Sequence, residues 1–321
     1  MEERLENFVK EGKINMKLAL SIVIVNYNTR LLVKKCIKSV IKNTQDINYE
    51  ILVIDNGSID GSQKTLDGLE KRYKNIKLVK NKKNLGFAAA NNQGMKLAEG
   101  DFVLLLNSDT IISDNAIGKM ADWMKNKPEV GISSCMLKDA NGDIQGTGGY
   151  FPELMRVFSW MIIQDIPFVD AVIKPFHPVK SKSIFKGYKF YEKERELDWI
   201  TGAFFMIRKE VISDIGYFDE GFFMYVEEVD YCYRAKNKGW KVYYTPLWEI
   251  THFGGASGDS WSFVIPEFEG IKMFYKKHYP KWQFPVLRIL LKTGALWRMC
   301  LFGILKGKGG FQAYAKAYKK A

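Results

Sequence analysis

The chain has little cysteine: four residues among 321, with no CxxC pair. Zinc knuckles and redox motifs need closely spaced cysteines, and small secreted domains need a regular cysteine framework. A zinc knuckle and a disulfide framework are therefore excluded, and we expect reduced thiols of the kind found in the cytoplasm. The first 17 residues also lack the apolar core of an export signal. No apolar run is long enough to cross a bilayer, so the sequence predicts a protein without a membrane span.

Acidic residues are absent from residues 281–321, which contain nine Lys or Arg. On an ideal helical wheel, apolar residues fill most of this segment, and four basic residues share one side: Lys281, Arg288, Lys292 and Lys306. This pattern resembles an interfacial helix on an anionic membrane. The alternative is a helix that packs on the rest of the chain with its lysines facing water. The missing acids, and Trp297 beside Arg298, favour the membrane.

The whole chain has the composition of a globular protein, with 47% hydrophobic and 14% aromatic residues and a net charge of +12. Its first half alternates strand and helix patterns. Strand patterns cover 18–28, the start of 49–62, 76–81 and 101–112, and helical patterns cover 30–43, a segment ending at 73, and 84–100. This alternation predicts a parallel sheet with helices on both faces.

Polar clusters follow three of the predicted strands: Asn26–Asn28, Asp55–Ser58 and Asn107–Asp109. Ligands of such sheets bind beyond the carboxyl ends of the strands, so we expect these clusters to line one crevice. Asp109 could hold a divalent cation against a diphosphate, and Asp55 could accept a hydrogen bond from a base or ribose. The alternatives are an Asx turn at Asp109 and an ordinary strand–turn–helix at Asp55.

The second half holds two further candidates and an irregular stretch, 150–196, which we interpret as facing the substrate. His252 follows an apolar strand and precedes a Gly-rich loop, so it is either a metal ligand or a structural histidine. The sequence "MYVEEVDYCYR" places three acids within four residues. Helical spacing puts Glu227, Asp230 and Arg234 on one face, with Asp230 and Arg234 able to pair. Glu228 points about 100° away from Glu227, which leaves a capped helix start, a metal site and a catalytic base as interpretations.

Seven blocks, in order, resemble a family 2 glycosyltransferase of the rhamnosyltransferase-like or galactofuranosyltransferase-like branch. They are "VIVNYN", "IDNGSIDGS", "NLGFAAANNQG", "LLLNSDT", "WITGAFFMIRKEV", "GYFDEGFFMYVEEVDYCYRAKNKGW" and "HFGGASG". The resemblance implies a GT-A fold, that is, an α/β, Rossmann-like mixed sheet flanked by helices. It also implies a nucleotide-diphosphate sugar donor, Mn²⁺ or Mg²⁺, and inversion at the anomeric carbon. We divide the chain into an extension (1–17), a glycosyltransferase domain (18–260) and a basic, amphipathic helical tail (261–321).

The resemblance also implies roles for individual residues. The nucleotide-binding residues are Tyr27, Asn28, Asp55, Asn84, Gly86, Phe87, Asn107 and Ser108. The metal ligands are Asp109 and His252, and the residues near the donor sugar and acceptor are Trp199, Thr201, Gly202 and Glu227. Glu228 is the catalytic base. The chain departs from the family pattern twice, because Asn107 replaces the first acid of the DxD motif and Glu228 stands where the family usually has Asp.

Three rival functions fit the sequence less well. A sugar-nucleotidyl transferase would have a Gly-rich loop after the first strand, but that loop reads "NYNTR". A nucleic-acid-binding protein would interleave basic and aromatic residues on a recognition element, whereas here the positive charge lies in the tail and the crevice motifs are acidic. A catalytically dead scaffold has no reason to keep Asp109, Glu228 and His252 together.

We therefore expect an inverting, metal-dependent glycosyltransferase of surface polysaccharide synthesis, with no nucleic-acid partner. The expected donor is dTDP-L-rhamnose, with UDP-galactofuranose or another UDP-hexose as the alternative. The expected acceptor is a glycan or a lipid-linked glycan, which we infer from the basic tail and the lysine-rich stretch 174–193. The expected location is peripheral, at an anionic membrane surface on the cytoplasmic face of the cell membrane.

Overall fold

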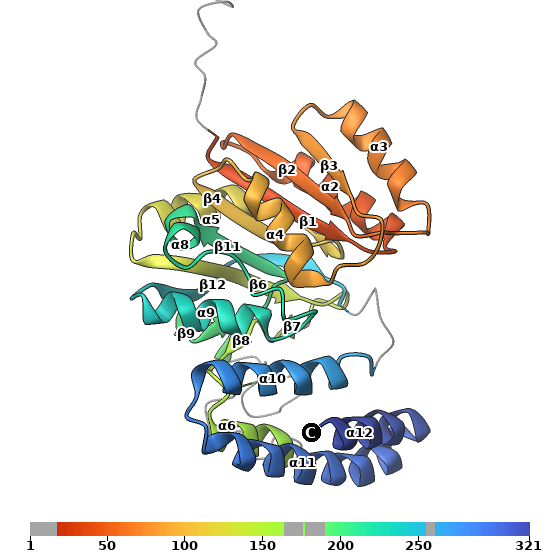
Figure 1. The fold of residues 1–321 in the computed structure, drawn as a ribbon. Helices are drawn as coiled ribbons and strands as arrows, with labels where there is room; N and C mark the ends of the chain where they lie inside the picture. The colour runs from red at the N-terminus through yellow and green to blue at the C-terminus, as the bar shows by residue number, and fades with distance from the viewer. Residues whose placement is uncertain (1–17, 164–175, 177–189, 255–260) are drawn as a thin grey trace, which may run out of the picture.

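A large mixed sheet forms the centre of the molecule (Figure 1). The computed structural model describes residues 18–163, 176, 190–254 and 261–321. Within these residues the main sheet has the order β3-β2-β1-β4-β11-β6-β12-β5, with β7 on β6 and β9 on β12. Its strands are β1 (Leu20–Asn26), β2 (Tyr49–Asp55), β3 (Ile76–Lys80), β4 (Phe102–Asn107), β5 (Thr110–Ile111), β6 (Val130–Lys138), β7 (Ile144–Gln145), β9 (Arg195–Leu197), β11 (Phe204–Arg208) and β12 (Lys241–His252). A separate ribbon pairs β8 (Gly148–Gly149) with β10 (Trp199–Ile200).

The first four strands are parallel, as the strand–helix alternation predicts. β11 then enters between β4 and β6 and runs antiparallel to both, which makes the sheet mixed. Successive side chains of a strand point to opposite faces. In β1, Leu20, Ile22 and Ile24 enter one buried cluster and Val23 enters the other, so both faces of the sheet are covered.

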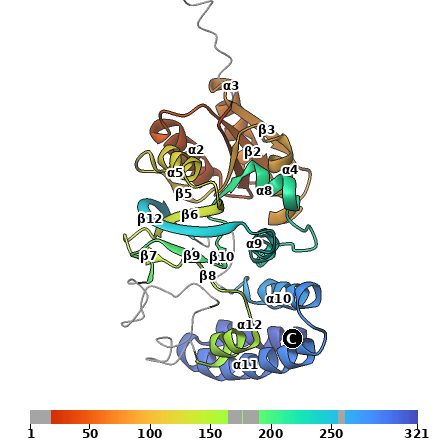
Figure 2. The same cartoon turned by 90° about the vertical axis from the view of Figure 1, so that its left-hand side faces the viewer.

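Helices pack on both faces of the sheet (Figures 1 and 2). One face carries α2 (Arg30–Asn43), α3 (Ser62–Arg72) and α5 (Ala116–Lys125). The opposite face carries α4 (Phe87–Leu97), α8 (Lys209–Ile215) and α9 (Glu227–Asn237). The predicted helix over 30–43 is confirmed at both ends, and the 84–100 helix is shorter because Gly86 and Gly100 lie outside it.

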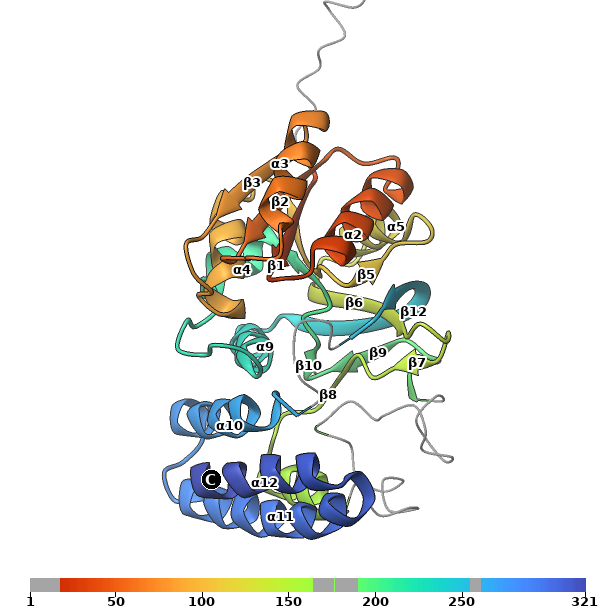
Figure 3. The same cartoon turned by 90° about the vertical axis from the view of Figure 1, so that its right-hand side faces the viewer.

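A further layer of helices lies beyond α9, away from β1–β3 (Figures 1 and 3). It contains α6 (Leu154–Phe158), the π-helix η1 (Ser159–Ile163), α10 (Val264–His278), α11 (Gln283–Lys306) and α12 (Lys308–Lys320). α10 lies between α9 and the pair α11 and α12, so the basic tail packs on the rest of the chain. Of the helices in the described ranges, none combines the length and apolarity that crossing a bilayer requires.

Three predicted features lie wholly or largely outside the described residues. They are the extension 1–17, most of the lysine-rich stretch 174–193, and most of the Gly-rich loop that follows His252.

Candidate active site

The carboxyl ends of β1, β2 and β4 meet, as the three polar clusters predict. The Asn26 amide donates to Asp55 Oδ1 at 2.8 Å and to Ser58 Oγ at 3.0 Å, which ties β1 to the turn after β2. The hydroxyls of Thr29 and Ser108 lie 2.9 Å apart and join β1 to the turn after β4. Parallel neighbours share one carboxyl edge, so residues distant in sequence meet here.

Asp55 lies beneath the surface of this edge. Its side chain is fully buried and accepts hydrogen bonds from Asn26, the Ser58 backbone and the Gln63 amide. In this structure Asp55 therefore organises the turn, and its predicted contact with a nucleoside stays a prediction. Asn28 braces the same turn from a left-handed backbone conformation (φ 52°). Its N–H donates to Ser58 and its side chain accepts from the Ile59 N–H.

The predicted nucleotide block at 84–87 connects the crevice to the loop before α9. Asn84 Oδ1 accepts from the Gly86 N–H at 2.9 Å, and the Phe87 N–H donates to the Phe223 carbonyl at 2.7 Å. Gly86 has φ 91°, and a Cβ there would lie 2.5 Å from that carbonyl oxygen. Only glycine combines this backbone conformation with such close approach. The contact with Phe223 carries no signal in the sequence.

The residues predicted near the donor sugar divide into two groups. Gly202 lies against the Phe87 ring, 3.1 Å from where its Cβ would be, which links this block to the nucleotide block. The Thr201 N–H is held by the Thr147 carbonyl at 2.8 Å. Trp199 is buried, and its indole N–H donates to backbone carbonyls of Tyr150 and Phe176. The Trp199 ring thus belongs to the core here, and its role toward a sugar stays a prediction.

Asp109 and His252 come together although 143 positions separate them. The short strand β5 pairs with the end of β12, with Thr110 opposite His252. As a result Asp109 Oδ1 lies 3.4 Å from His252 Nε2, and the Asn107 amide lies 3.5 Å from the same nitrogen. Two ligands about 2.1 Å from one small divalent cation are about 3.0–3.4 Å apart, so this spacing suits a shared metal.

Gln145 fixes how His252 faces Asp109. The Gln145 amide nitrogen donates to the His252 carbonyl at 2.8 Å, so its oxygen accepts from His252 Nδ1, also at 2.8 Å. Nδ1 therefore carries the hydrogen, and Nε2 turns its lone pair toward the Asp109 carboxylate. Two electron-rich atoms that face each other favour a cation, and an outer partner such as Gln145 commonly orients a metal-binding histidine. Sequence reasoning missed Gln145, because nothing in "GDIQGTGG" distinguishes it.

The protein supplies few metal ligands beyond this pair. In the part of the chain that the structure describes, no three His, Cys, Asp or Glu residues gather around one point. Sites of Mg²⁺ or Mn²⁺ that also bind substrate phosphates need only one or two protein ligands. The donor set of Asp109 and His252 fits that type of site.

α9 begins at Glu227, after two residues in an unusual backbone conformation. Tyr225 and Val226 have φ 69° and 72°, a region that costs a bulky or β-branched residue roughly 1–3 kcal/mol. Gly270 of α10 packs against this turn, where a Cβ would lie 2.8 Å from Val226. This turn could not be predicted from the sequence, because glycine usually fills positions with a positive φ and neither residue is glycine. The turn aims the first residues of α9, and with them Glu227 and Glu228.

Glu227 and Glu228 form a pair of neighbouring carboxyl groups. Burial, and then the charge of Glu228, raise the pKa of Glu227 well above its usual range. Oε2 of Glu227 is buried and makes no hydrogen bond to the described residues. Burial and nearby Glu267, Glu227 and Glu228 also raise the pKa of Tyr225 to about 12. Two neighbouring buried carboxyl groups disfavour double ionisation, and the role of Glu228 as a catalytic base stays a prediction.

Asp230 joins α9 to α10. Its fully buried carboxylate accepts from Arg234 at 2.8 Å, which confirms the predicted pair, and from Lys277 at 2.5 Å and His278 at 2.7 Å. Lys277 also pairs with Asp219 at 2.7 Å. The contacts from α10 are 47 and 48 positions away and could not be read from helical spacing.

The ionised Asp230 carboxylate makes the free energy of unfolding depend on pH in the acidic range. Burial alone would raise the pKa of Asp230, but His278, Lys277 and Arg234 outweigh it and hold the pKa at about 2. A lowered pKa stabilises the fold above the ordinary value of 3.8, and that stability is lost as the pH falls toward about 2. We expect a loss of about 2 kcal/mol from this group between about pH 5 and about pH 2. In urea titrations, the gap between wild type and Asp230→Asn should narrow with falling pH, and a constant gap would contradict the assignment.

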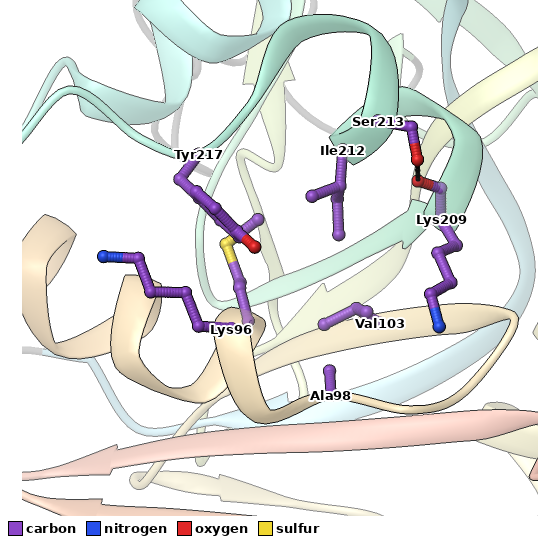
Figure 4. Close-up of a pocket in the computed structure, with 8 residues that line it drawn as sticks. Lys96, Ala98, Val103, Lys209, Ile212, Ser213 and Tyr217 are labelled. Carbon is purple, nitrogen blue, oxygen red and sulfur yellow. Dashed lines mark hydrogen bonds between the residues drawn. The ribbon is translucent and has the colours of Figure 1, made fainter.

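A hollow of about 300 Å³ elsewhere in the molecule is not part of this site. Its lining includes Val103, at the amino end of β4, whereas the crevice lies at the carboxyl end beyond Asn107. Figure 4 shows the ammonium groups of Lys96 and Lys209 pointing away from each other at its rim. The two ammonium groups do not converge on one point where an anion could bind, so the candidate active site remains the crevice.

Comparisons with known proteins agree with this geometry. The model of the family described as Glycosyl transferase family 2 matches residues 21–216. N-acetylglucosaminyl-diphospho-decaprenol L-rhamnosyltransferase of Mycobacterium tuberculosis is 28% identical over 214 residues, which cover 63% of this chain and 66% of that protein. Rhamnosyltransferase WbbL of Escherichia coli is 23% identical over 254 residues, covering 77% of this chain and 87% of that protein. The chain thus spans slightly less than two thirds of the mycobacterial relative.

Two solved structures share the fold. GalNAc-T7 with UDP, GalNAc and Mn²⁺ matches with a TM-score of 0.61 at 17% identity, over 87% of this chain and 51% of that chain, about half its length. Mannosyltransferase PcManGT from Pyrobaculum calidifontis with GDP-Man and Mn²⁺ matches with a TM-score of 0.55 at 13% identity, over 98% of this chain and 79% of that one. The predicted mixed α/β fold of GT-A type, with helices at its carboxyl end, is confirmed. Since the family model covers more than half of the sequence, the chain belongs to glycosyl transferase family 2.

Proposed function

We propose that this protein transfers a sugar, L-rhamnose, from a nucleotide-diphosphate donor to a hydroxyl group of a glycan or lipid-linked acceptor. The observation that carries the proposal is the meeting of Asp109 and His252 at the polar edge of the sheet. Relatives from Mycobacterium tuberculosis and Escherichia coli that are named rhamnosyltransferases support the sugar. The proposed role is surface polysaccharide synthesis at the cytoplasmic face of the membrane.

The donor nucleotide lies over the joined ends of β1, β2 and β4 in this proposal. Tyr27 and Asn28 approach the nucleoside, and Asn84 and Phe87 shape the pocket from the start of α4. Asn107 and Ser108 lie next to Asp109 and face the diphosphate. These side chains occupy the edge that Asn26 and Thr29 tie together.

Asp109 and His252 would hold a divalent cation, Mn²⁺ or Mg²⁺. Their spacing, the orientation that Gln145 imposes and the mixed oxygen and nitrogen donors all fit such an ion. When bound, the ion neutralises the negative charge that develops on the diphosphate leaving group.

Glu228 is the base of the proposed reaction. Its carboxylate takes the proton of the acceptor hydroxyl while the hydroxyl oxygen attacks the anomeric carbon from the face opposite the diphosphate. The carbon–oxygen bond to the donor phosphate breaks and its electron pair leaves with the nucleoside diphosphate. A single displacement inverts the anomeric carbon and needs no protein nucleophile. Burial and Glu228 raise the pKa of Glu227, which favours the protonated form of that carboxyl over the ionised one.

A donor screen tests the proposal. Calorimetric titration with Mn²⁺ present should show binding of dTDP-L-rhamnose, and slow hydrolysis of this donor should stop when EDTA removes the metal. Preferred binding and turnover of UDP-galactofuranose or another UDP-hexose would contradict the proposed donor sugar and leave the proposed reaction unchanged. Absence of metal-dependent turnover with every donor would refute the enzymatic function and favour a nucleotide-binding scaffold.

Gln145→Leu tests the metal site within the same assay. The change removes the partner that orients His252 and leaves both proposed ligands in place. We expect Mn²⁺ affinity to fall by about 10–100-fold. Gln312→Leu, at an exposed position of α12, is the matched control and should leave the affinity unchanged. Equal Mn²⁺ affinity in both variants would show that Gln145 does not support the metal site.

A further inference from the structure

The inner face of α11 is an ordinary packing surface. Leu287, Leu291 and Ala295 are fully buried in the core that α11 shares with α6, η1, α10 and α12. Arg298 is also buried, donates to the Trp160 carbonyl and lies over the Trp160 ring. Packing on the rest of the chain therefore accounts for the inner half of this helix, and the outer half needs a separate explanation.

The outer face of α11 is apolar and exposed. Exposed apolar side chains recur at spacings of three, four or seven residues, with two adjacent pairs, from just before the helix to its end: Trp282, Val286, Ile289, Leu296, Trp297, Ile304 and Leu305. Ile304 is 84% exposed and Trp282 is 65% exposed. At 1.5 Å per residue the stripe runs for about 35 Å. A soluble monomer seldom leaves so continuous an apolar surface in water, so the stripe indicates an interaction site.

The charges around the stripe select the class of partner. Residues 281–321 contain nine Lys or Arg and no acid, and Lys281 and Arg288 are exposed beside the stripe. Glu269 of α10 pairs with Lys320 of α12 at 3.3 Å. A second copy of the chain would bring positive charge against positive charge. An anionic bilayer matches both properties, because phosphates meet the lysines while acyl chains receive the apolar side chains.

A shallow groove between α11 and α12 continues the same surface. It has a volume of about 450 Å³ and is lined by Met299, Ile304 and Phe311, with Lys308 at its edge. Apolar walls beside a lysine suit an acyl chain with its phosphate. In Figures 1 and 3, α11 and α12 form the outermost layer of the molecule, on the side away from β1–β3, where a flat surface can reach them.

We propose that the outer face of α11, with the adjoining end of α12, docks on an anionic lipid bilayer and lies in its interfacial region. This inference deepens the proposed function, which supplies its purpose because a lipid-linked acceptor lies in a membrane. Its evidence is separate, since no residue of the crevice takes part. Docking leaves α10 between the bilayer and α9.

Vesicle flotation of the full chain tests the docking face. The protein should float with phosphatidylcholine vesicles that contain phosphatidylglycerol, float poorly with phosphatidylcholine alone, and detach as salt is raised. The double variant Ile289→Glu/Ile304→Glu should reduce vesicle binding roughly ten-fold or more, because two apolar side chains are lost to the bilayer and two charges repel it. The control Leu97→Glu/Leu247→Glu alters two exposed leucines outside these helices and should bind as wild type.

The outcomes separate docking from catalysis. Donor hydrolysis without vesicles should be equal in wild type and the Ile289→Glu/Ile304→Glu variant, which also shows that the variant is folded. Wild type that hydrolyses donor but binds no anionic vesicles would overturn the docking face and leave the function standing. A concentration-dependent dimer in light scattering, abolished by this variant, would assign the face to a second copy and would also overturn it. Vesicle binding without turnover of any donor would contradict the proposed enzymatic function and leave the docking face standing.

Discussion

Glu228→Gln should reduce sugar transfer and donor hydrolysis by roughly 10²–10⁴-fold, while donor affinity changes little. Glutamine has nearly the shape of glutamate but cannot accept the proton of the attacking hydroxyl. The loss should appear in kcat, because the proton moves only in the transition state. Initial rates with Mn²⁺ and a calorimetric titration of the donor together measure both quantities.

Glu227→Gln is the matched control, one residue away on the same helix. Burial and Glu228 raise the pKa of Glu227, which favours the protonated form of its carboxyl, and glutamine resembles that form. We therefore expect Glu227→Gln to keep most of the activity. A reversed result, with Glu227→Gln inactive and Glu228→Gln active, would exchange the two roles. Normal turnover of both variants would move the base away from the start of α9.

Asp230→Asn should lower the free energy of unfolding by about 3–5 kcal/mol at neutral pH. The substitution preserves the shape of the side chain but removes the charge that Arg234, Lys277 and His278 share. Asp230 is fully buried, and without its charge the partly buried Arg234 and Lys277 lose a common counter-charge, which costs more than the loss of a surface pair. Urea titration monitored by circular dichroism measures the change.

Asp219→Asn is the comparison that shows how much of the effect of Asp230→Asn comes from burial and how much comes from losing any ion pair with Lys277. Asp219 also contacts Lys277, but its side chain is 35% exposed, so water replaces part of the lost interaction. We expect a loss of about 1 kcal/mol or less. Equal losses in the free energy of unfolding for Asp219→Asn and Asp230→Asn would show that burial of Asp230 does not increase the stabilisation from its ion pairs.

Much of the fold and part of the candidate site could be predicted from the sequence. Apolar runs locate the parallel strands, which are covered on both faces, and helical periodicity locates α2, which turns one apolar side toward the sheet. Polar clusters at strand ends predict a shared crevice, because parallel neighbours end at one edge. The pair of Asp230 and Arg234 follows from helical spacing alone.

Other features depend on contacts that no local pattern encodes. Gln145 meets His252 across 107 positions, and His278 meets Asp230 across 48. The left-handed turn at Tyr225 and Val226 is hidden because neither residue favours that conformation. The helical wheel of residues 281–321 also treats all apolar residues alike, whereas packing buries Leu287 and Leu291 and exposes Ile289. A wheel shows which residues share a side but not which side faces a neighbour.

The buried junction at Asp230 has a consequence for how this protein can diverge. His278 and Lys277 belong to α10, at the start of the tail, and Asp230 belongs to the helix that carries the proposed base. If recombination replaced the tail with that of another protein, the buried Asp230 carboxylate would lose Lys277 and His278 unless the new tail supplied equivalent partners. The glycosyltransferase domain and the tail are coupled through this junction, so a tail taken from another protein should pack stably here only if it brings matching cations.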